Sequence, residues 1–133
     1  MADASYPQDL LYHPEHDWVR IDDGDETLAV FGITWYAQDA LGEVVFFDPP
    51  AVGTAVSAGE SYTEVESVKA VSDVIAPLSG EIIEANESLG DSPEAINDDP
   101  YGEGWLIRIR LSDPSEVDTL LDVEAYQAVV AEQ

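Results

Sequence analysis

The chain alternates short apolar segments with polar and turn-forming residues, and this pattern predicts strands more often than helices. Runs rich in Val, Ile, Phe, Tyr and Trp are bounded by Gly, Pro and Asp, which is typical of β-strands. The strand-like segments are residues 18–21, 28–33, 44–47, 62–66, 70–75, 80–84 and 105–111. We therefore expect an all-β fold with minor helices.

Helical patterns occupy a smaller part of the chain. Residues 34–41 predict a helix, with Thr34 as its N-cap and Gly42 ending it. Further helical segments are expected at 93–96, 115–121 and 123–132. These helices are interpreted as additions to the sheets.

The sequence also contains a weak internal repeat. Gly-Glu-Val-Val at 42–45 recurs as Gly-Glu-Ile-Ile at 80–83, which predicts two similar halves. The length of 133 residues lies within the usual range of one domain. We therefore expect a single domain over residues 1–133.

Charge is the least ordinary property of the chain. It has 29 Asp and Glu residues against 4 Lys and Arg residues, a formal net charge of -25 at pH 7. Self-repulsion on this scale destabilises a compact state, but at about 1 M salt the Debye length falls to roughly 3 Å. We interpret the composition as adaptation to a salty cytoplasm. Nucleic acid is not an expected partner, because Arg20, Arg108 and Arg110 form no basic patch.

Several classes of function are not expected. The chain has no cysteine, and therefore no disulfide, thiolate metal site or cysteine nucleophile. His13 and His16 lack a further ligand cluster, so we expect no metal. The sequence has no apolar run of membrane-spanning length and no signal-peptide pattern, which predicts a cytoplasmic protein without a membrane partner. It has neither a phosphate loop nor a nucleophile elbow to indicate an enzyme.

Lys69 is the single lysine of the chain. It lies between the strand-like segments 62–66 and 70–75, so a turn around residues 67–70 would place it at a hairpin tip. A hairpin tip is exposed but rigidly mounted, and lysine offers a long stem with an amine that can form a stable amide. This position suits the attachment of a prosthetic group that other enzymes must reach.

Several segments of the chain resemble one known family. Glu-Ser-Val-Lys-Ala at 66–70, followed by Ser-Asp at 72–73, is similar to the lipoylation segment of the glycine cleavage system H protein family. Further similar segments, in the same order along the chain, lie at 12–19, 32–38, 41–46, 77–81 and 97–105. The resemblance covers a core of about residues 12–126 and leaves short N- and C-terminal extensions.

The resemblance implies a barrel-sandwich hybrid of two antiparallel sheets with pseudo-two-fold symmetry. It also implies covalent lipoate on Lys69 and no catalytic activity of the chain's own. The implied function is to carry the aminomethyl group of glycine from a pyridoxal-phosphate glycine decarboxylase to a tetrahydrofolate-dependent aminomethyltransferase. Dihydrolipoamide dehydrogenase, which reoxidises the carrier, and a lipoylating enzyme are the other implied partners. The redox chemistry would belong to the cofactor, which agrees with the absence of cysteine.

The resemblance also assigns side chains around Lys69. The segment recognised during lipoylation corresponds to Glu66, Ser67, Val68 and Ala70. The cleft that shields the loaded arm is lined by positions that correspond to Glu15, Asp17 and Asp73. Carboxylates there would pair with the protonated amine of the aminomethyl group.

Other functions remain open at this point. A biotinyl domain typically flanks its lysine with methionines, whereas Val68 and Ala70 flank Lys69. A lipoyl domain of a 2-oxo-acid dehydrogenase lacks segments like those at 32–34 and 100–105. The motifs do not separate a glycine cleavage carrier from a stand-alone H-like lipoyl carrier that serves another pathway. An acidic interaction module with unmodified Lys69 is the alternative from a different class.

Overall fold

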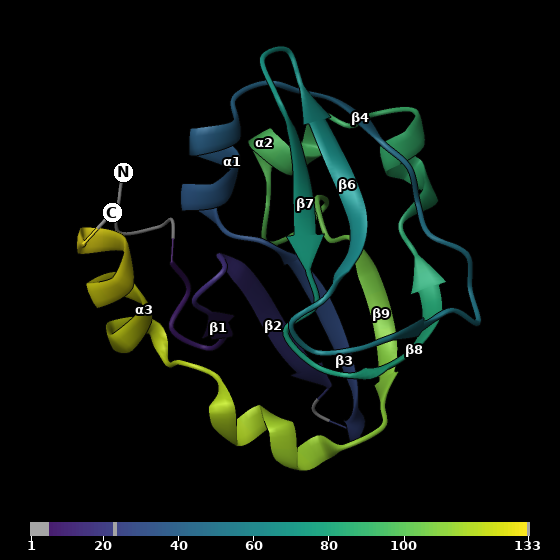
Figure 1. Cartoon of the computed structure of the whole chain (residues 1–133), viewed down its shortest axis with the longest axis vertical. Coiled ribbons are helices and arrows are strands. Elements are labelled where there is room, and N and C mark those ends of the chain that lie inside the picture. The colour runs from purple at the N-terminus through teal and green to yellow at the C-terminus, as the bar shows by residue number, and fades with distance from the viewer. Residues whose placement is uncertain (1–5, 23, 133) are drawn as a thin grey trace.

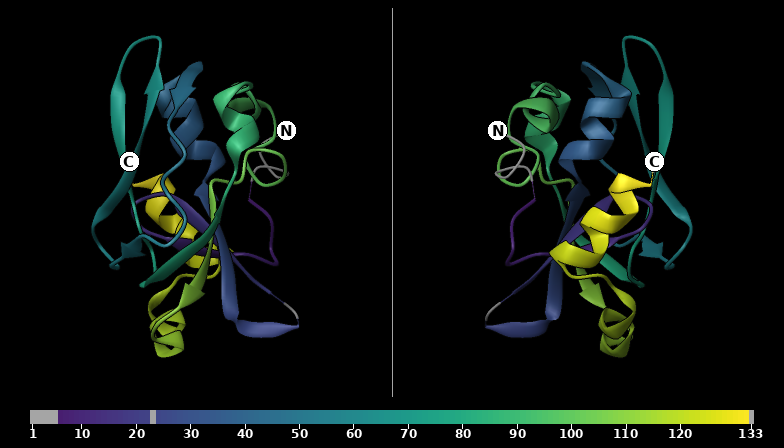
Figure 2. Two further views of the ribbon diagram at one scale, coloured as in Figure 1. Left: turned by 90° about the vertical axis from the view of Figure 1, so that its right-hand side faces the viewer. Right: turned by 90° about the vertical axis from the view of Figure 1, so that its left-hand side faces the viewer.

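The computed structural model, which describes residues 6–22 and 24–132, has two antiparallel sheets (Figure 1). The larger sheet has the order β1 (Leu11–His13), β2 (Asp17–Asp22), β3 (Asp25–Ile33), β9 (Ile107–Leu111), β8 (Gly80–Ala85) and β5 (Ala55–Val56). The smaller sheet has the order β4 (Val44–Phe47), β6 (Ser61–Ser67) and β7 (Val71–Ile75). In the side views, the β6–β7 hairpin forms a separate layer beside the larger sheet (Figure 2). The predicted mainly β fold with two antiparallel sheets is confirmed.

Short helices surround the sheets. They are α1 (Trp35–Leu41), the 3-10 helix η2 (Glu87–Gly90), α2 (Ala95–Asp98), the 3-10 helix η3 (Pro114–Thr119) and α3 (Val123–Ala131). The first α-helix lies near the projecting end of the β6–β7 hairpin, and the last one packs beside β1 (Figure 1). No helix within the described residues is long and apolar enough to cross a membrane.

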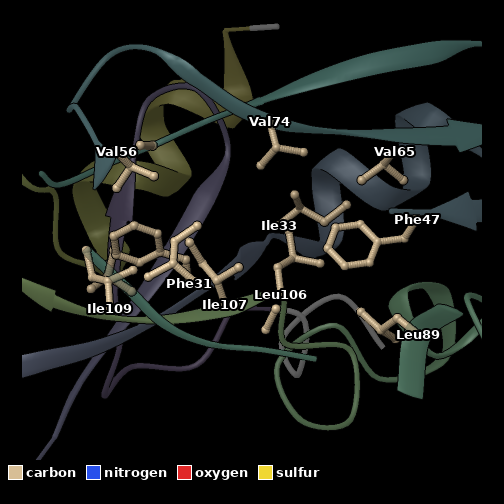
Figure 3. Close-up of a cluster of buried hydrophobic side chains, with 14 of the residues drawn as sticks. Phe31, Ile33, Phe47, Val56, Val65, Val74, Leu89, Leu106, Ile107 and Ile109 are labelled. Carbon is tan, nitrogen blue, oxygen red and sulfur yellow. The ribbon is translucent and has the colours of Figure 1, made fainter. Parts of the chain in front are cut away.

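The main core lies between the two sheets. Alternate strand residues face this layer, so that Phe31 and Ile33 of β3 meet Val65 of β6 and Val74 of β7 (Figure 3). All four side chains are buried, and their removal from water stabilises the contact between the sheets. The hairpin that carries Lys69 is therefore anchored by its inward-facing residues.

A second buried cluster fixes the C-terminal helix. It contains Leu10, Tyr12, Trp18 and Tyr126. The Trp18 indole lies directly over Gly32, where a Cβ atom would overlap the ring, and its Nε1 donates to the carbonyl of Pro100 at 2.9 Å. This close packing explains why glycine is required at position 32.

The ends of several elements differ from the sequence predictions. The helical segment predicted at 115–121 is present as a 3-10 helix over Pro114–Thr119, but its predicted end is wrong, because Leu121 is extended. The Leu121 N–H donates to the Tyr12 carbonyl at 2.7 Å, so pairing with β1 replaces the expected helical bond. The strand predicted from residue 105 begins at Ile107, and the turn expected at 93–96 continues as α2.

The predicted boundaries of the first helix are confirmed. The Thr34 side chain accepts the Ala37 N–H at 3.3 Å, and Gly42 ends the helix with a φ of 90°. The two copies of the internal repeat lead into β4 and β8, which belong to different sheets. The two copies of this short motif therefore contribute to different layers.

Candidate functional site

Lys69 lies in the turn of the β6–β7 hairpin, as predicted, and this hairpin projects from the body of the molecule (Figure 1). Ser67 closes the turn. Its N–H donates to the Ala70 carbonyl at 2.8 Å, and its Oγ accepts the N–H groups of Lys69 at 3.2 Å and Ala70 at 3.0 Å. A short hydroxyl side chain satisfies backbone donors that a tight turn leaves without strand partners. The lysine backbone is thus held firmly while its side chain remains exposed.

The outer part of the lysine side chain lies beside Gly42. A Cβ atom added to that glycine would come within 3.2 Å of Lys69 Cε. The neighbouring Val68 N–H donates to the Glu43 carbonyl at 3.0 Å, which ties the hairpin tip to the segment after α1. Within residues 6–22 and 24–132, no carboxylate lies within ion-pair distance of Lys69 Nζ. Because the Lys69 side chain is also exposed, an incoming enzyme can reach its ammonium.

Asn97 fixes the segment on which the lysine rests. Its Nδ2 donates to the Gly42 carbonyl at 2.8 Å and to Gln38 Oε1 at 2.9 Å, while its Oδ1 accepts the Val44 N–H at 2.8 Å. One amide side chain from α2 thus joins the end of α1 to the start of β4. Asn97 lies in one of the segments that resemble the family, but the sequence did not indicate this role.

The three acidic residues that the resemblance assigned to a cleft line the same pocket. Glu15 and Asp17 approach it from one side, and Asp73 of β7 approaches it from the other sheet. The pocket has a volume of about 50 Å³, which is room for about one or two water-sized groups. The rest of its lining consists of His16, Ile33, Ala37, Leu41, Val65, Ser72 and Val74.

These three carboxyl groups have different environments. Asp73 and Glu15 are exposed, whereas Asp17 is only 2% exposed. Among the described residues, Asp17 Oδ2 has no hydrogen-bond partner. Burial, followed by the nearby charge of Glu15, raises the pKa of Asp17 well above its usual range. Asp17 therefore retains its proton more readily than an ordinary carboxyl group and would gain most from a cationic partner.

His16 also lines this pocket, although it was not predicted to belong to the cleft. It has a φ of 76°, which is uncommon for a residue other than glycine. Its carbonyl accepts the Thr34 N–H at 3.0 Å, and its Nδ1 lies 2.8 Å from the Tyr126 hydroxyl. Burial lowers the pKa of His16. Its position between Glu15 and Asp17 was the sole sequence signal for a place in the cleft.

The residues assigned to recognition during lipoylation occupy several environments. Val68 and Ala70 are exposed at the tip, while Glu66 is half-buried on β6. Ser67 is buried, and its hydroxyl is used inside the turn. An enzyme could therefore contact Val68 and Ala70 directly. Ser67 instead fixes the backbone of the turn that presents them.

Comparisons with known proteins agree with this geometry. The family model described as glycine cleavage H-protein matches residues 10–133. The chain is 54% identical to the glycine cleavage system H protein of Halorhodospira halophila over 98% of each chain. It is 52% identical to that of Bacteroides thetaiotaomicron, covering 95% of this chain and 98% of the relative.

A solved structure extends the agreement to the fold. The crystal structure of a glycine cleavage system H protein from Mycobacterium marinum matches with a TM-score of 0.84 and 44% identity. The match covers 94% of this chain and 98% of that chain. The chain therefore belongs to the glycine cleavage H-protein family, whose members are non-catalytic lipoyl carriers with the barrel-sandwich hybrid fold.

Proposed function

We propose that Lys69 bears lipoate in amide linkage and that the chain carries the aminomethyl group of glycine between enzymes of the glycine cleavage system. The observation that carries this proposal is the position of the single lysine at the exposed tip of a rigid hairpin. The names of the relatives favour this role over an H-like carrier that serves another pathway. They also favour it over a biotinyl domain or an unmodified acidic module.

The surroundings of Lys69 fit an attached group. Gly42 has no side chain to obstruct the lysine stem, and the ammonium forms no ion pair within the described residues. When bound, lipoate supplies a disulfide that takes up the aminomethyl group and electrons, which the cysteine-free chain cannot do itself. The contribution of the protein is to hold the attachment point out from the body and keep it accessible.

The pocket beside the hairpin fits the positively charged end of the cargo. Asp73 lies on the exposed side and Asp17 is buried, so a protonated amine would meet carboxyl groups from both sheets. Ile33, Leu41 and Val65 line the apolar wall and would limit the access of water. We propose that these residues, together with Glu15, retain the aminomethyl group between enzymes.

The partners follow from the proposed role. We propose a pyridoxal-phosphate glycine decarboxylase as donor, a tetrahydrofolate-dependent aminomethyltransferase as acceptor, and dihydrolipoamide dehydrogenase as the reoxidising enzyme. A lipoylating enzyme would recognise Glu66, Ser67, Val68 and Ala70. A cytoplasmic location and a single domain over the whole chain remain predictions.

The direct test is a Lys69→Arg substitution. Wild-type protein from cells that attach lipoate should show the mass increment of one lipoyl amide, whereas the variant should show none. The variant should also fail to support glycine cleavage, because arginine retains the charge but cannot form the same amide. Its melting temperature should stay close to that of the wild type, since Lys69 is exposed. A lipoyl increment that persists on the variant would place the attachment elsewhere.

A further inference from the structure

Several of the exposed apolar side chains of this acidic chain lie on the hairpin of Lys69 and on the neighbouring strand β4. The most exposed large hydrophobic residues are Trp35, Val45, Phe46, Val52, Val68 and Val71. Val68 and Val71 flank the hairpin turn, with 67% and 59% of their surfaces exposed, and Phe46 lies on the neighbouring strand β4 at 48%. Water disfavours such surfaces, and a cluster of them indicates a contact with another molecule.

A β-bulge exposes the aromatic member of this cluster. A regular strand turns alternate side chains inward, but Val44 and Phe47 are buried while Val45 and Phe46 are both exposed. The register between β4 and β6 shifts between Val44 and Phe46. The irregularity therefore turns two consecutive apolar residues outward, which is a common use of bulges near functional sites.

Strand register places this phenylalanine beside the hairpin residues. Phe46 pairs with Glu66, and Glu66 pairs with Val71, so the three residues lie in one row across the outer face of the smaller sheet. The next outward-facing residue along β6 is Glu64, which is exposed. The surface therefore consists of apolar groups on both sides of one carboxylate, bordered by further negative charge.

We propose that Phe46, Glu66, Val68 and Val71 form the docking surface for the lipoylating enzyme, which presents apolar side chains around a basic residue. The inference rests on the proposed attachment of lipoate to Lys69. An enzyme that forms the amide must bring its active centre to Lys69 Nζ and so must contact the residues beside it. Enzymes that act on the sulfur atoms of the arm work at its far end and do not need this surface.

The composition of the docking surface also suits high salt. At about 1 M salt the Debye length is roughly 3 Å, so attraction between separated charges contributes little. Apolar burial is not screened, and a basic residue in direct contact with Glu66 keeps part of its attraction. The apolar residues therefore supply affinity, and Glu66 orients the partner.

Substitutions that keep the strand test the surface. Val71→Thr and Phe46→Thr replace apolar groups by a strand-compatible polar residue, and Val52→Thr is the matched control, because Val52 is 62% exposed but lies beside β8. We measure kcat and KM for lipoylation of each purified unmodified chain by the host's lipoylating enzyme. The Phe46→Thr, Val71→Thr double variant should raise KM about tenfold, which is typical of losing an interface anchor, with kcat little changed. A KM equal to that of the wild type and of the control would overturn the proposal.

A second measurement separates docking from folding and from the attachment itself. After prolonged incubation that completes lipoylation, the double variant should show the wild-type KM with glycine decarboxylase. An equal loss with both enzymes would contradict a surface specific to the lipoylating enzyme. If the wild-type chain is never modified, the proposed attachment fails. If it is modified and the variants are modified equally well, the docking surface alone fails.

Discussion

Asp17 is the carboxyl group whose environment departs most clearly from that of a solvated acid. It is buried beside the pocket, and burial raises its pKa well above the usual range. The folded state therefore favours the protonated form. The stability associated with this group is fully present below the ordinary pKa near 3.8 and is lost as the pH rises toward the higher folded value.

An Asp17→Asn substitution should remove this pH dependence. The free energy of unfolding of the variant should increase relative to that of the wild type between about pH 4 and pH 8. Over this range the carboxyl group ionises readily in the unfolded wild type, whereas burial opposes its ionisation in the folded wild type. Denaturant unfolding at both pH values, in the same concentration of KCl, measures the change. Asp73→Asn is the exposed control. The same difference between wild type and Asp17→Asn at both pH values would show that folding does not raise the pKa of Asp17.

Asp73 provides a test of the cleft without disturbing the core. Asp73→Asn should leave lipoylation intact and shorten the lifetime of the carried aminomethyl group by about two- to fivefold, the range expected from losing one exposed ion pair. Release of the group from the loaded carrier into water can be followed over time. An unchanged lifetime would assign Asp73 to the solvated surface.

At the scale of elements, Tyr126 connects the last helix to the segment that carries Glu15 and Asp17. Its ring stacks on Tyr12 with a centroid distance of 4.8 Å. Its hydroxyl lies 2.8 Å from His16 Nδ1 and 2.7 Å from Thr34 Oγ1. One hydroxyl group thus joins α3, the cleft segment and the cap of α1.

Tyr126→Phe should therefore destabilise the protein while keeping the aromatic packing. Loss of the hydroxyl leaves His16 Nδ1 and Thr34 Oγ1 without this hydrogen-bond partner. The free energy of unfolding should therefore fall by about 1–2 kcal/mol. Tyr36→Phe is the matched control, since no hydrogen bond is found for the Tyr36 hydroxyl within the described residues and its ring also lies near His16. Equal stability of the Tyr126 variant and the wild type in urea would rule out a structural role for this hydroxyl.

Alternation of apolar residues predicted most strands because it records which face is buried. It predicted 44–47 with the observed boundaries of β4, but it could not reveal the bulge that exposes Phe46. The strands Leu11–His13 and Ala55–Val56 were missed, since such short segments become strands only by pairing with distant partners.

Part of the candidate site could be predicted from the sequence, and part could not. The hairpin tip followed from turn residues between two strand patterns, and the cleft residues came from family resemblance. The burial of Asp17 could not be predicted, because nothing local distinguishes it among 29 acidic residues. Hydrogen bonds to Thr34 and Tyr126 hold His16 at the cleft. These bonds form between segments far apart in the sequence, so the position of His16 could not be predicted from the sequence.

At the scale of the whole molecule, carboxylates greatly outnumber the groups that could neutralise them. The formal net charge is -25, and the described residues contain one ion pair, between Arg108 and Glu84 at 3.3 Å. Both partners are partly exposed, so the pair contributes little to stability. Neutralisation of the surface therefore depends on dissolved ions.

Stability should rise steeply with salt for this reason. Between about 0.1 M and 2 M KCl the Debye length falls from roughly 10 Å to below 3 Å, and the melting temperature should increase markedly. Most of the gain should come below about 1 M if screening is the cause. Thermal unfolding followed by circular dichroism measures this effect. A melting temperature that stays flat or falls with KCl would contradict adaptation to high salt.

Lipoylation of Lys69 is tested most directly by the intact mass of the chain purified from its native cells while they degrade glycine, followed by peptide mapping. The expected result is a mass increment of one lipoyl amide, located on the peptide that contains Lys69. An unmodified chain from such cells, or a lipoyl group on another residue, would contradict the account.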